Sequence, residues 1–383
     1  MKVLYYIQNV SHKEGSWLSL SALIKYMMGH KVTPVIVAPY EIKKDSVFVD
    51  YCTSNNIRCY YVPIFFPKLS IRRSAFGRWI RLWMYEMRFV PSKYRCARKL
   101  YQIVKKEKPD IIHTNVGVLR EGLWVAKFCK IPHVWHLREY QDLDFSWDIY
   151  PSKRVYERLL RKSDAIVTIT YNIKSYFNLT GVKYAYTVYN GIEANVVREI
   201  QMPKEKYFLV ASRIYPEKGI LEIINVFKKF YDTHTNYKLV IAGDCSHEYA
   251  KMLVDKFANE ESIIFVGWKN QTDLETLMSH ATALVVNSRF EGLGRMSVES
   301  ILRGSLVIGK DVAGTKEIRQ KVGGVLGYNN EHGLLTCMEN VCNINEEQYR
   351  KLILEAQDKA KVLFSIEKNG EKIMNVYDLV SKS

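Results

Sequence analysis

Short apolar runs alternate with longer amphipathic segments along almost the whole chain. Runs of four to eight apolar residues rich in branched side chains are typical of buried strands. Segments 220–232 and 246–259 place apolar residues three to four positions apart, which predicts helices. The predicted strands are KVLYYI, TPVIVAP, RCYYVPI, DIIHTN, HVWHL, AIVTIT and YTVYNG in the first half, and YFLVASRI, YKLVIAG, IIFVGW, ALVVNS, SLVIG and GGVLGY in the second.

Alternating strands and helices predict parallel sheets with helices on both faces. Two successive series of this kind predict an α/β fold with two Rossmann-like, doubly wound domains facing across a cleft. A polar stretch at 193–206, containing Pro203, interrupts the pattern. We therefore expect domains at 1–195 and 196–365, and a C-terminal helix at 366–383 that packs back on the first domain. Ligands of such sheets bind outside the carboxyl ends of the strands.

Composition favours an ordinary globular protein, since 48% of the 383 residues are hydrophobic and 25% are charged. No apolar run approaches the roughly 20 residues that span a bilayer. The first seven residues are too short for a signal peptide and read as a strand. Seven cysteines at wide spacing, without a CxxC pair or metal-site pattern, predict free thiols in a reducing compartment. We therefore expect a cytoplasmic protein.

The net charge of +16 is unusual, and much of it lies between Pro67 and Lys108, where 13 Lys and Arg stand against 2 Glu. A basic amphipathic helix with tryptophans predicts contact with an anionic membrane surface, here the inner face of the cell membrane. Two alternatives stay open: the apolar stripe packs on the domain's own sheet, or the charge binds nucleic acid. No nucleic-acid motif accompanies the charge, so we expect no nucleic-acid partner. On a helix, Phe76, Trp79, Ile80, Trp83, Met87 and Val90 form the apolar stripe, and Arg78, Arg81 and Arg88 lie on another face.

A strand-to-helix turn is predicted where Glu291 and Glu299 flank a glycine pair, between the runs ALVVNS and SLVIG. Glycines let the backbone approach a ligand, and the first N–H groups of a helix bind anions. With Glu291 in the turn and Glu299 in the helix, both carboxylates can face one pocket. This arrangement suits a diphosphate with a hydroxyl-rich group at each end, as in a nucleotide-sugar. The alternative is that both glutamates are solvated helix residues.

Arg213 and Lys218 follow the predicted strand YFLVAS and precede a helix. Two cations at the carboxyl end of a strand can converge on one pyrophosphate, the arginine bidentately and the lysine as a point charge. The alternative is an ordinary pair of surface charges.

Five linked motifs resemble the family-4 glycosyltransferases of the GT-B fold, and the resemblance covers nearly the whole chain. That family carries Arg, four residues and Lys-Gly after a strand, and later Glu-x7-Glu, which is the spacing of Glu291 and Glu299. The segments Leu306 to Glu317, Val188 to Glu193 and Pro109 to His113 are similar to its other motifs.

The resemblance implies a role for each site residue. Arg213 and Lys218 would bind the donor diphosphate and stabilise charge on the leaving nucleotide, while Glu291 would hold hydroxyls of the transferred sugar and Glu299 those of the ribose. The N-terminal domain would bind the acceptor and the C-terminal domain the nucleotide-sugar. The remaining donor contacts would be the backbone N–H groups of Gly294, Arg295 and Met296, with Gly267 and Trp268 lining the base pocket.

Two segments depart from the family pattern. The family has His-Asp at the end of a first-domain strand, the histidine touching the donor sugar, but here His136 is followed by Leu-Arg-Glu. We expect His136 to keep this role; otherwise it is a hydrogen-bonded structural residue. The loop after the first strand has one glycine, so Gly15 and Ser16 are either backbone contacts to phosphate or sugar or a plain turn and helix cap.

The resemblance implies a retaining transferase. No carboxylate is identifiable as a nucleophile, so we expect same-face displacement through an oxocarbenium-like transition state. No Asp-x-Asp motif occurs in the cleft segments, so we expect no metal and no cofactor, with a UDP-sugar as the favoured donor. The expected acceptor is a lipid-linked or cell-surface glycan precursor, as in exopolysaccharide synthesis. The alternatives are a soluble acceptor, or a nucleic-acid-binding or regulatory protein with a degenerate site.

Overall fold

The computed structural model describes residues 1–10, 15–64, 75–145, 148–193 and 196–382. The chain forms two compact units, one of Met1–Gly191 with Ile366–Ser383 and the other of Ile192–Ser365. The end of the chain therefore belongs to the first unit, together with its beginning. Within the described ranges, no helix combines the length and the apolar character that crossing a bilayer requires.

The first unit is built on a parallel seven-stranded sheet in the order β3-β2-β1-β4-β5-β6-β7. Its strands are β1 (Lys2–Ile7), β2 (Thr33–Pro39), β3 (Arg58–Val62), β4 (Ile111–Asn115), β5 (His133–Leu137), β6 (Ala165–Thr168) and β7 (Ala185–Thr187). Its helices are α1 (Gly15–Gly29), η1 (Tyr40–Lys44), α2 (Ser46–Ser54), α3 (Ala75–Glu107), α4 (Glu121–Cys129), α5 (Asp142–Phe145), α6 (Lys153–Leu160), α7 (Tyr171–Tyr176) and α15 (Ile366–Ser381).

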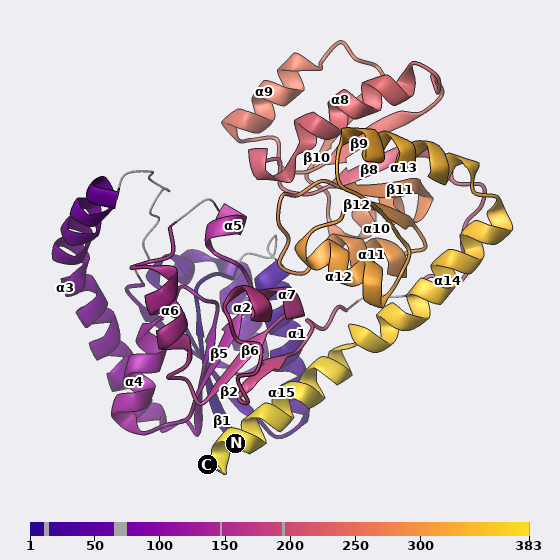
Figure 1. Ribbon diagram of the computed structural model, residues 1–383. Helices are drawn as coiled ribbons and strands as arrows, with labels where there is room; N and C mark the ends of the chain where they lie inside the picture. The colour runs from indigo at the N-terminus through magenta and orange to yellow at the C-terminus, as the bar shows by residue number, and fades with distance from the viewer. Residues whose placement is uncertain (11–14, 65–74, 146–147, 194–195, 383) are drawn as a thin grey trace. The chain divides into compact units, whose positions relative to one another are not determined.

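Helices cover both faces of this sheet because its strands are apolar on both sides. Along β1, Val3 and Tyr5 join a core that also contains residues of α1, α2 and α15. The intervening Leu4 and Tyr6 join a second core formed with α3 and α4. This alternation follows from the two-residue period of a strand. Helix α4 lies beside the second half of α3 (Figure 1).

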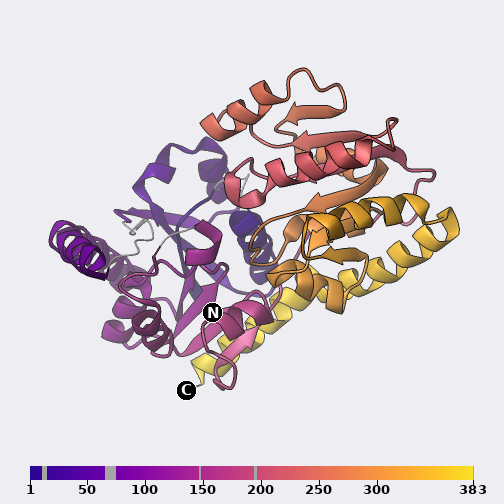
Figure 2. The ribbon, with the colours of Figure 1, turned by 45° about the horizontal axis from the view of Figure 1, so that its top comes forward.

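Helix α3 changes character along its length. In its second half, Cys96, Leu100 and Val104 are buried in the core. Its earlier turns (Figure 2) contact the rest of the first unit through Arg81, which lies 4.0 Å from Asp148, and the exposed apolar side chains there are Ile80, Trp83, Met84, Met87, Val90 and Tyr94. Residues 67–74 of the predicted basic helix, and the side chains of Phe76, Arg78 and Trp79, lie outside what the structure describes.

The second unit is built on a parallel six-stranded sheet in the order β10-β9-β8-β11-β12-β13. Its strands are β8 (Glu205–Ala211), β9 (Lys238–Ala242), β10 (Ile263–Gly267), β11 (Ala281–Val286), β12 (Leu306–Lys310) and β13 (Val325–Tyr328). Its helices are η2 (Pro216–Lys218), α8 (Ile220–Tyr231), α9 (Glu248–Lys256), α10 (Gln271–His280), α11 (Arg295–Leu302), α12 (Ala313–Lys321), α13 (Glu331–Asn343) and α14 (Glu346–Leu363).

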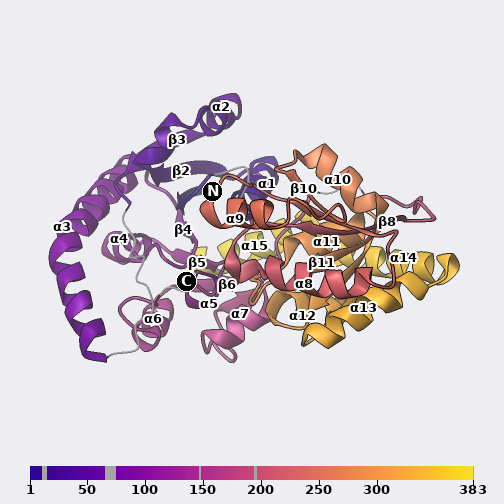
Figure 3. The same ribbon diagram turned by 90° about the horizontal axis from the view of Figure 1, so that it is seen from above.

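The strand order of the second unit determines where a ligand binds. The chain leaves β8 toward β9 on one side, whereas β11 lies on the other side of β8 and leads on to β12. The connections after β8 and β11 therefore diverge, which creates a crevice at the carboxyl ends of these two strands. Helices α8 and α13 lie side by side in this unit (Figure 3).

The predicted α/β fold with two parallel sheets is confirmed, and each predicted apolar run contains a strand. The predicted helices at 220–232 and 246–259 correspond to α8 and α9. Several predicted runs continue past their strands, and YTVYNG does so furthest, because β7 ends at Thr187 rather than at Gly191. Val188 N still donates to Thr168 O of β6, but from Tyr189 on the chain binds side chains: Tyr189 O accepts from Asn369, and Asn190 accepts from Arg138.

Candidate functional site

The turn after β8 carries Lys218 at the end of η2, followed by Gly219. Gly219 has a φ of 63°, in the left-handed region that favours glycine. A Cβ at this position would lie 2.4 Å from Asn287 Nδ2, so no side chain fits. Asn287 Nδ2 donates to Gly219 O at 2.9 Å. The asparagine at the end of β11 thus holds the turn that carries the lysine.

Lys218 and Glu291 form an ion pair at the carboxyl ends of β8 and β11. Lys218 Nζ lies 2.6 Å from Glu291 Oε1, and the two side chains are 16% and 21% exposed. Ser288 Oγ donates to the same carboxylate oxygen at 2.6 Å. Burial opposes ionisation of Glu291, but the ammonium of Lys218 and the hydroxyl of Ser288 outweigh it, so the pKa of this carboxyl lies below its ordinary value. The carboxylate is therefore ionised at neutral pH.

The glycine turn between β11 and α11 is held by the start of α12. Gly314 N donates to Glu291 O at 3.0 Å. A Cβ on Gly314 would lie 2.6 Å from the backbone of Leu293, so only glycine allows this close approach. Gly294 has a φ of 80° and directly precedes α11, which begins with Arg295 and Met296. The first N–H groups of a helix have no preceding turn to accept from them, which is why helix starts bind anions.

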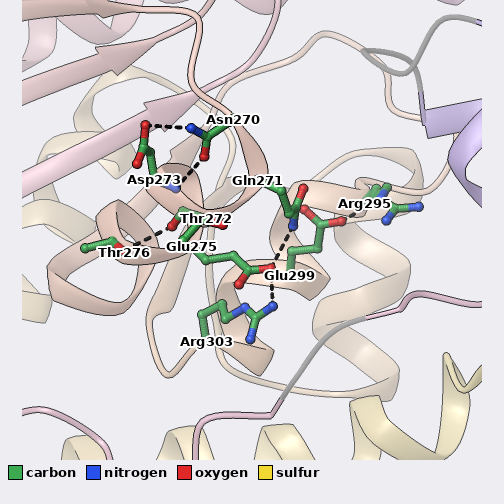
Figure 4. Close-up of polar contacts among 9 residues, drawn as sticks. All are labelled: Asn270, Gln271, Thr272, Asp273, Glu275, Thr276, Arg295, Glu299 and Arg303. Atoms are coloured by element: carbon green, nitrogen blue, oxygen red, sulfur yellow. Dashed lines mark hydrogen bonds and ion pairs between the residues drawn. The ribbon is translucent and has the colours of Figure 1, made fainter. Parts of the chain in front are cut away.

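Glu299 lies inside α11 and is 4% exposed. Arg295, one turn earlier on the same helix, donates from Nε to Glu299 Oε1 at 2.6 Å. Figure 4 shows the Glu299 carboxylate beside Gln271, the first residue of α10. Gln271 Nε2 donates to Glu275 at 2.9 Å, and Glu275 also pairs with the buried Arg303. Glu299 thus forms an ion pair with Arg295 of its own helix, on the face of the sheet that α10 and α11 cover.

The other predicted residues of the second unit are more exposed. Arg213 is exposed, and its guanidinium carbon lies 5.6 Å from the centre of the Tyr215 ring. Its charge also contributes to the lowered pKa of Glu291, which places it in the same electrostatic environment. Gly267, at the end of β10, has a φ of 70° with open space around the missing Cβ, and Trp268 is 54% exposed. The carboxyl ends of β8, β10 and β11 therefore carry every predicted residue of this unit.

His136, Gly15 and Ser16 belong to the first unit. His136 is completely buried in β5, where its Nδ1 lies 3.2 Å from His113 Nε2. Its Nε2 is buried and has no hydrogen-bond partner among the described residues. Gly15 is exposed and Ser16 half-buried in the first turn of α1. The residues before them, 11–14, lie outside the described part of the chain.

Sequence reasoning did not single out Asn287, Ser288 or Tyr328. Tyr328 Oη donates to Asn287 Oδ1 at 2.9 Å, and this bond orients the amide so that its nitrogen faces Gly219. The position of Asn287 and Ser288, at the end of the predicted strand ALVVNS and shortly before Glu291, was the available signal. Nothing in the local sequence of Tyr328 indicates this contact, because Tyr328 lies 41 residues from Asn287. Across the described ranges, no three His, Cys, Asp or Glu side chains are grouped so as to hold a metal ion.

Two family models match adjacent parts of the chain. Residues 20–196 match the model described as Glycosyltransferase Family 4, and residues 194–335 match the one described as Glycosyl transferases group 1. The second match contains the turn after β8 and the segment from Glu291 to Glu299. The two matches together run through both units.

Individual relatives agree with these matches. An uncharacterized 42.6 kDa protein from the cps region of Klebsiella pneumoniae is 21% identical over 412 residues, covering 98% of each chain. Alpha-monoglucosyldiacylglycerol synthase of Streptococcus pneumoniae is 28% identical over 246 residues, covering 56% of this chain and 55% of that enzyme. The crystal structure of Anabaena HepE in complex with UDP-glucose has a TM-score of 0.74 at 18% identity, covering 99% of this chain and 100% of HepE. At that identity the structural likeness establishes the fold.

Proposed function

We propose that this chain, which belongs to the glycosyltransferases of group 1 and family 4 with the GT-B fold, transfers a sugar from a nucleotide-sugar to a lipid-linked or cell-surface glycan precursor. The observation that carries the donor assignment is the Lys218–Glu291 ion pair at the point where the connections after β8 and β11 diverge. A cation and a carboxylate in contact there suit a ligand that has both phosphates and hydroxyls.

In the proposed donor complex, Lys218 and Arg213 bind the diphosphate and stabilise the charge that develops on the leaving nucleotide. The N–H groups at the start of α11 add a second positive pole near the same phosphates. Glu291 accepts hydrogen bonds from the transferred sugar, and Glu299 accepts them from the ribose. Gly267 and Trp268 line the base pocket. HepE, which has the same fold, was crystallised with UDP-glucose, and this favours a UDP-sugar as donor.

The proposed chemistry retains the configuration of the sugar. No carboxylate of the second unit is assigned as a nucleophile, since Glu291 and Glu299 both hold hydroxyls. The acceptor hydroxyl therefore attacks on the face that the diphosphate leaves, and the departing phosphate oxygen takes its proton. Arg213 and Lys218 supply the positive charge that a metal ion supplies in other transferases.

Lys218→Ala tests the donor assignment. We expect nucleotide-sugar turnover to be lost while the fold survives, because the variant removes the ammonium that faces the diphosphate. The matched control is Lys228→Ala, which breaks another lysine–glutamate pair of this unit, with Glu260. Thermal shift with UDP-, GDP- and dTDP-sugars identifies the nucleotide, since a ligand of the folded state raises the melting temperature. Wild-type turnover in the Lys218 variant would disprove the assignment.

The proposed acceptor rests on the first half of α3. Trp83 is 59% exposed and Met87 is 66% exposed, so these two side chains do not pack on the unit's own sheet. The second half does pack there, through Cys96, Leu100 and Val104, which lie outside the predicted stripe. Exposed apolar side chains beside basic ones suit the interface of an anionic leaflet, where each cation contributes about 1 kcal/mol. A peripheral position on the cytoplasmic face of the membrane, with a lipid-linked acceptor, follows from this proposal.

Vesicle co-sedimentation tests membrane contact. We expect the wild type to sediment with anionic vesicles, and the double variant Trp83→Ser, Met87→Ser to remain in solution. The control is Val362→Ser with Leu379→Ser, which removes two apolar side chains of similar exposure elsewhere. Equal sedimentation of both variants would favour a soluble acceptor. Tight oligonucleotide binding at physiological salt, without sugar transfer, would favour the nucleic-acid alternative.

A further inference from the structure

A chain of buried hydrogen bonds runs from α15 to His136 at the end of β5. Tyr377 Oη lies 3.3 Å from Tyr5 Oη and 2.6 Å from His113 Nδ1. His113 Nε2 in turn lies 3.2 Å from His136 Nδ1. All four side chains are completely buried. Because buried polar atoms need partners, these contacts hold both imidazole rings in one arrangement.

The direction of donation along this chain follows from the geometry at Tyr377. A tyrosine hydroxyl has one proton, and Tyr377 donates it to Tyr5 Oη. The oxygen of Tyr377 must then accept from His113 Nδ1–H. Burial, and next the positive charge of Arg138, lower the pKa of both histidines well below the ordinary value, so each ring is neutral and has one N–H.

A neutral His113 with its proton on Nδ1 can only accept at Nε2. The proton in the contact between the two rings therefore belongs to His136 Nδ1. This leaves His136 Nε2 without a proton, as an acceptor that is buried and has no partner in the described part of the chain. An unpaired buried acceptor is costly, and a donor that reaches it removes this cost.

We infer that Tyr377 and His113 are positioning residues that hold His136 as its Nδ1–H tautomer, so that Nε2 accepts a hydrogen bond from a hydroxyl of the sugar substrate. The identification of this hydroxyl rests on the proposed function, whereas the tautomer itself does not. In the opposite tautomer, Nε2–H would be a donor, and the sugar hydroxyl would have to turn its oxygen toward the ring. The last helix of the chain thus determines how the histidine at the end of β5 meets its ligand.

The experiment is two-bond ¹H–¹⁵N correlation NMR on protein labelled with ¹⁵N-histidine, which distinguishes the two tautomers of a neutral ring. In the wild type we expect the His136 proton on Nδ1. Tyr377→Phe removes the acceptor for His113, so both rings should move their proton to Nε2, and kcat for sugar transfer should fall about tenfold. The matched control is Tyr156→Phe, because Tyr156 is also completely buried but donates to the backbone oxygen of Gly117 at 2.9 Å rather than to a histidine.

A second variant keeps the proposal testable if Tyr377→Phe fails to fold. Tyr5→Phe leaves Tyr377 in place but removes the acceptor of its proton, which frees Tyr377 to donate to His113 and should shift both tautomers in the same direction. A wild-type His136 with its proton on Nε2, or tautomers unchanged in both variants, would overturn the inference. A wild type with the expected tautomer but no sugar transfer would contradict the proposed function and leave the relay standing.

Discussion

Replacing Glu291 by glutamine should separate donor binding from sugar transfer. In the unliganded protein, Glu291 neutralises Lys218, the cation proposed to bind the diphosphate, through a contact of 2.6 Å. Glutamine keeps an oxygen for Lys218 and Ser288 but removes the negative charge. The Lys218 ammonium still donates to a neutral oxygen, but it loses the attraction between opposite charges, which contributes about 1 kcal/mol for a partly exposed pair. This free energy becomes available to the phosphates, so UDP should bind roughly fivefold more tightly.

Transfer should change in the opposite direction. The variant loses the charged acceptor for a sugar hydroxyl, so kcat/KM should fall by roughly 10- to 100-fold. Isothermal titration with UDP and a radiolabelled transfer assay measure the two effects separately. Glu260→Gln is the control, because it neutralises the partner of Lys228 at an exposed site of the same unit. UDP binding that weakens together with transfer would refute this reasoning, and it would mean that Glu291 positions Lys218 rather than competing for it.

Three further outcomes are expected. The folded-state pKa of Glu291 is lowered, so its pairing adds stability above the unfolded pKa of about 4.3 and loses it as the pH falls through the folded value. Urea unfolding of Lys218→Met should therefore show a loss of about 1–2 kcal/mol at pH 7 and a smaller loss at pH 3; an equal loss at both would contradict the assignment. Gly219→Ala should lower the melting temperature and weaken UDP binding through its clash with Asn287, whereas Gly181→Ala, at φ 89° with open space around it, should show backbone strain alone. Transfer should persist in EDTA, and its abolition with rescue by Mn²⁺ would disprove metal independence.

The strands and the turn motifs were predictable from the sequence because both are local. Apolar runs such as the one at β11 identify strands through burial on both faces, and a turn that binds an anion needs glycine at particular positions. Glu291, Gly294 and Glu299 lie within nine residues of one another. Their placement in a turn and a following helix was predicted correctly.

The sequence did not indicate which distant residues pair. The ion pair joins Lys218 to a carboxylate 73 residues away, because β8 and β11 are neighbours in the sheet although β9 and β10 separate them in the chain. His113 and Tyr377 lie 264 positions apart in the sequence, so their contact was even less predictable. The division of α3 into a packed half and an exposed half was also undetermined, since the same apolar periodicity continues through both.

The sequence by itself determined the alternation of strands and helices, the parallel sheets that follow from it, and the residue types at the strand ends. These depend on periodicity and on backbone conformation, which neighbouring residues decide. Only the tertiary structure decided that Glu291 neutralises Lys218, that Asn287 holds the turn that carries this lysine, and that a tyrosine of the last helix orients His136. Those contacts depend on the strand order and on the return of α15 to the first unit, which bring distant residues within hydrogen-bonding distance.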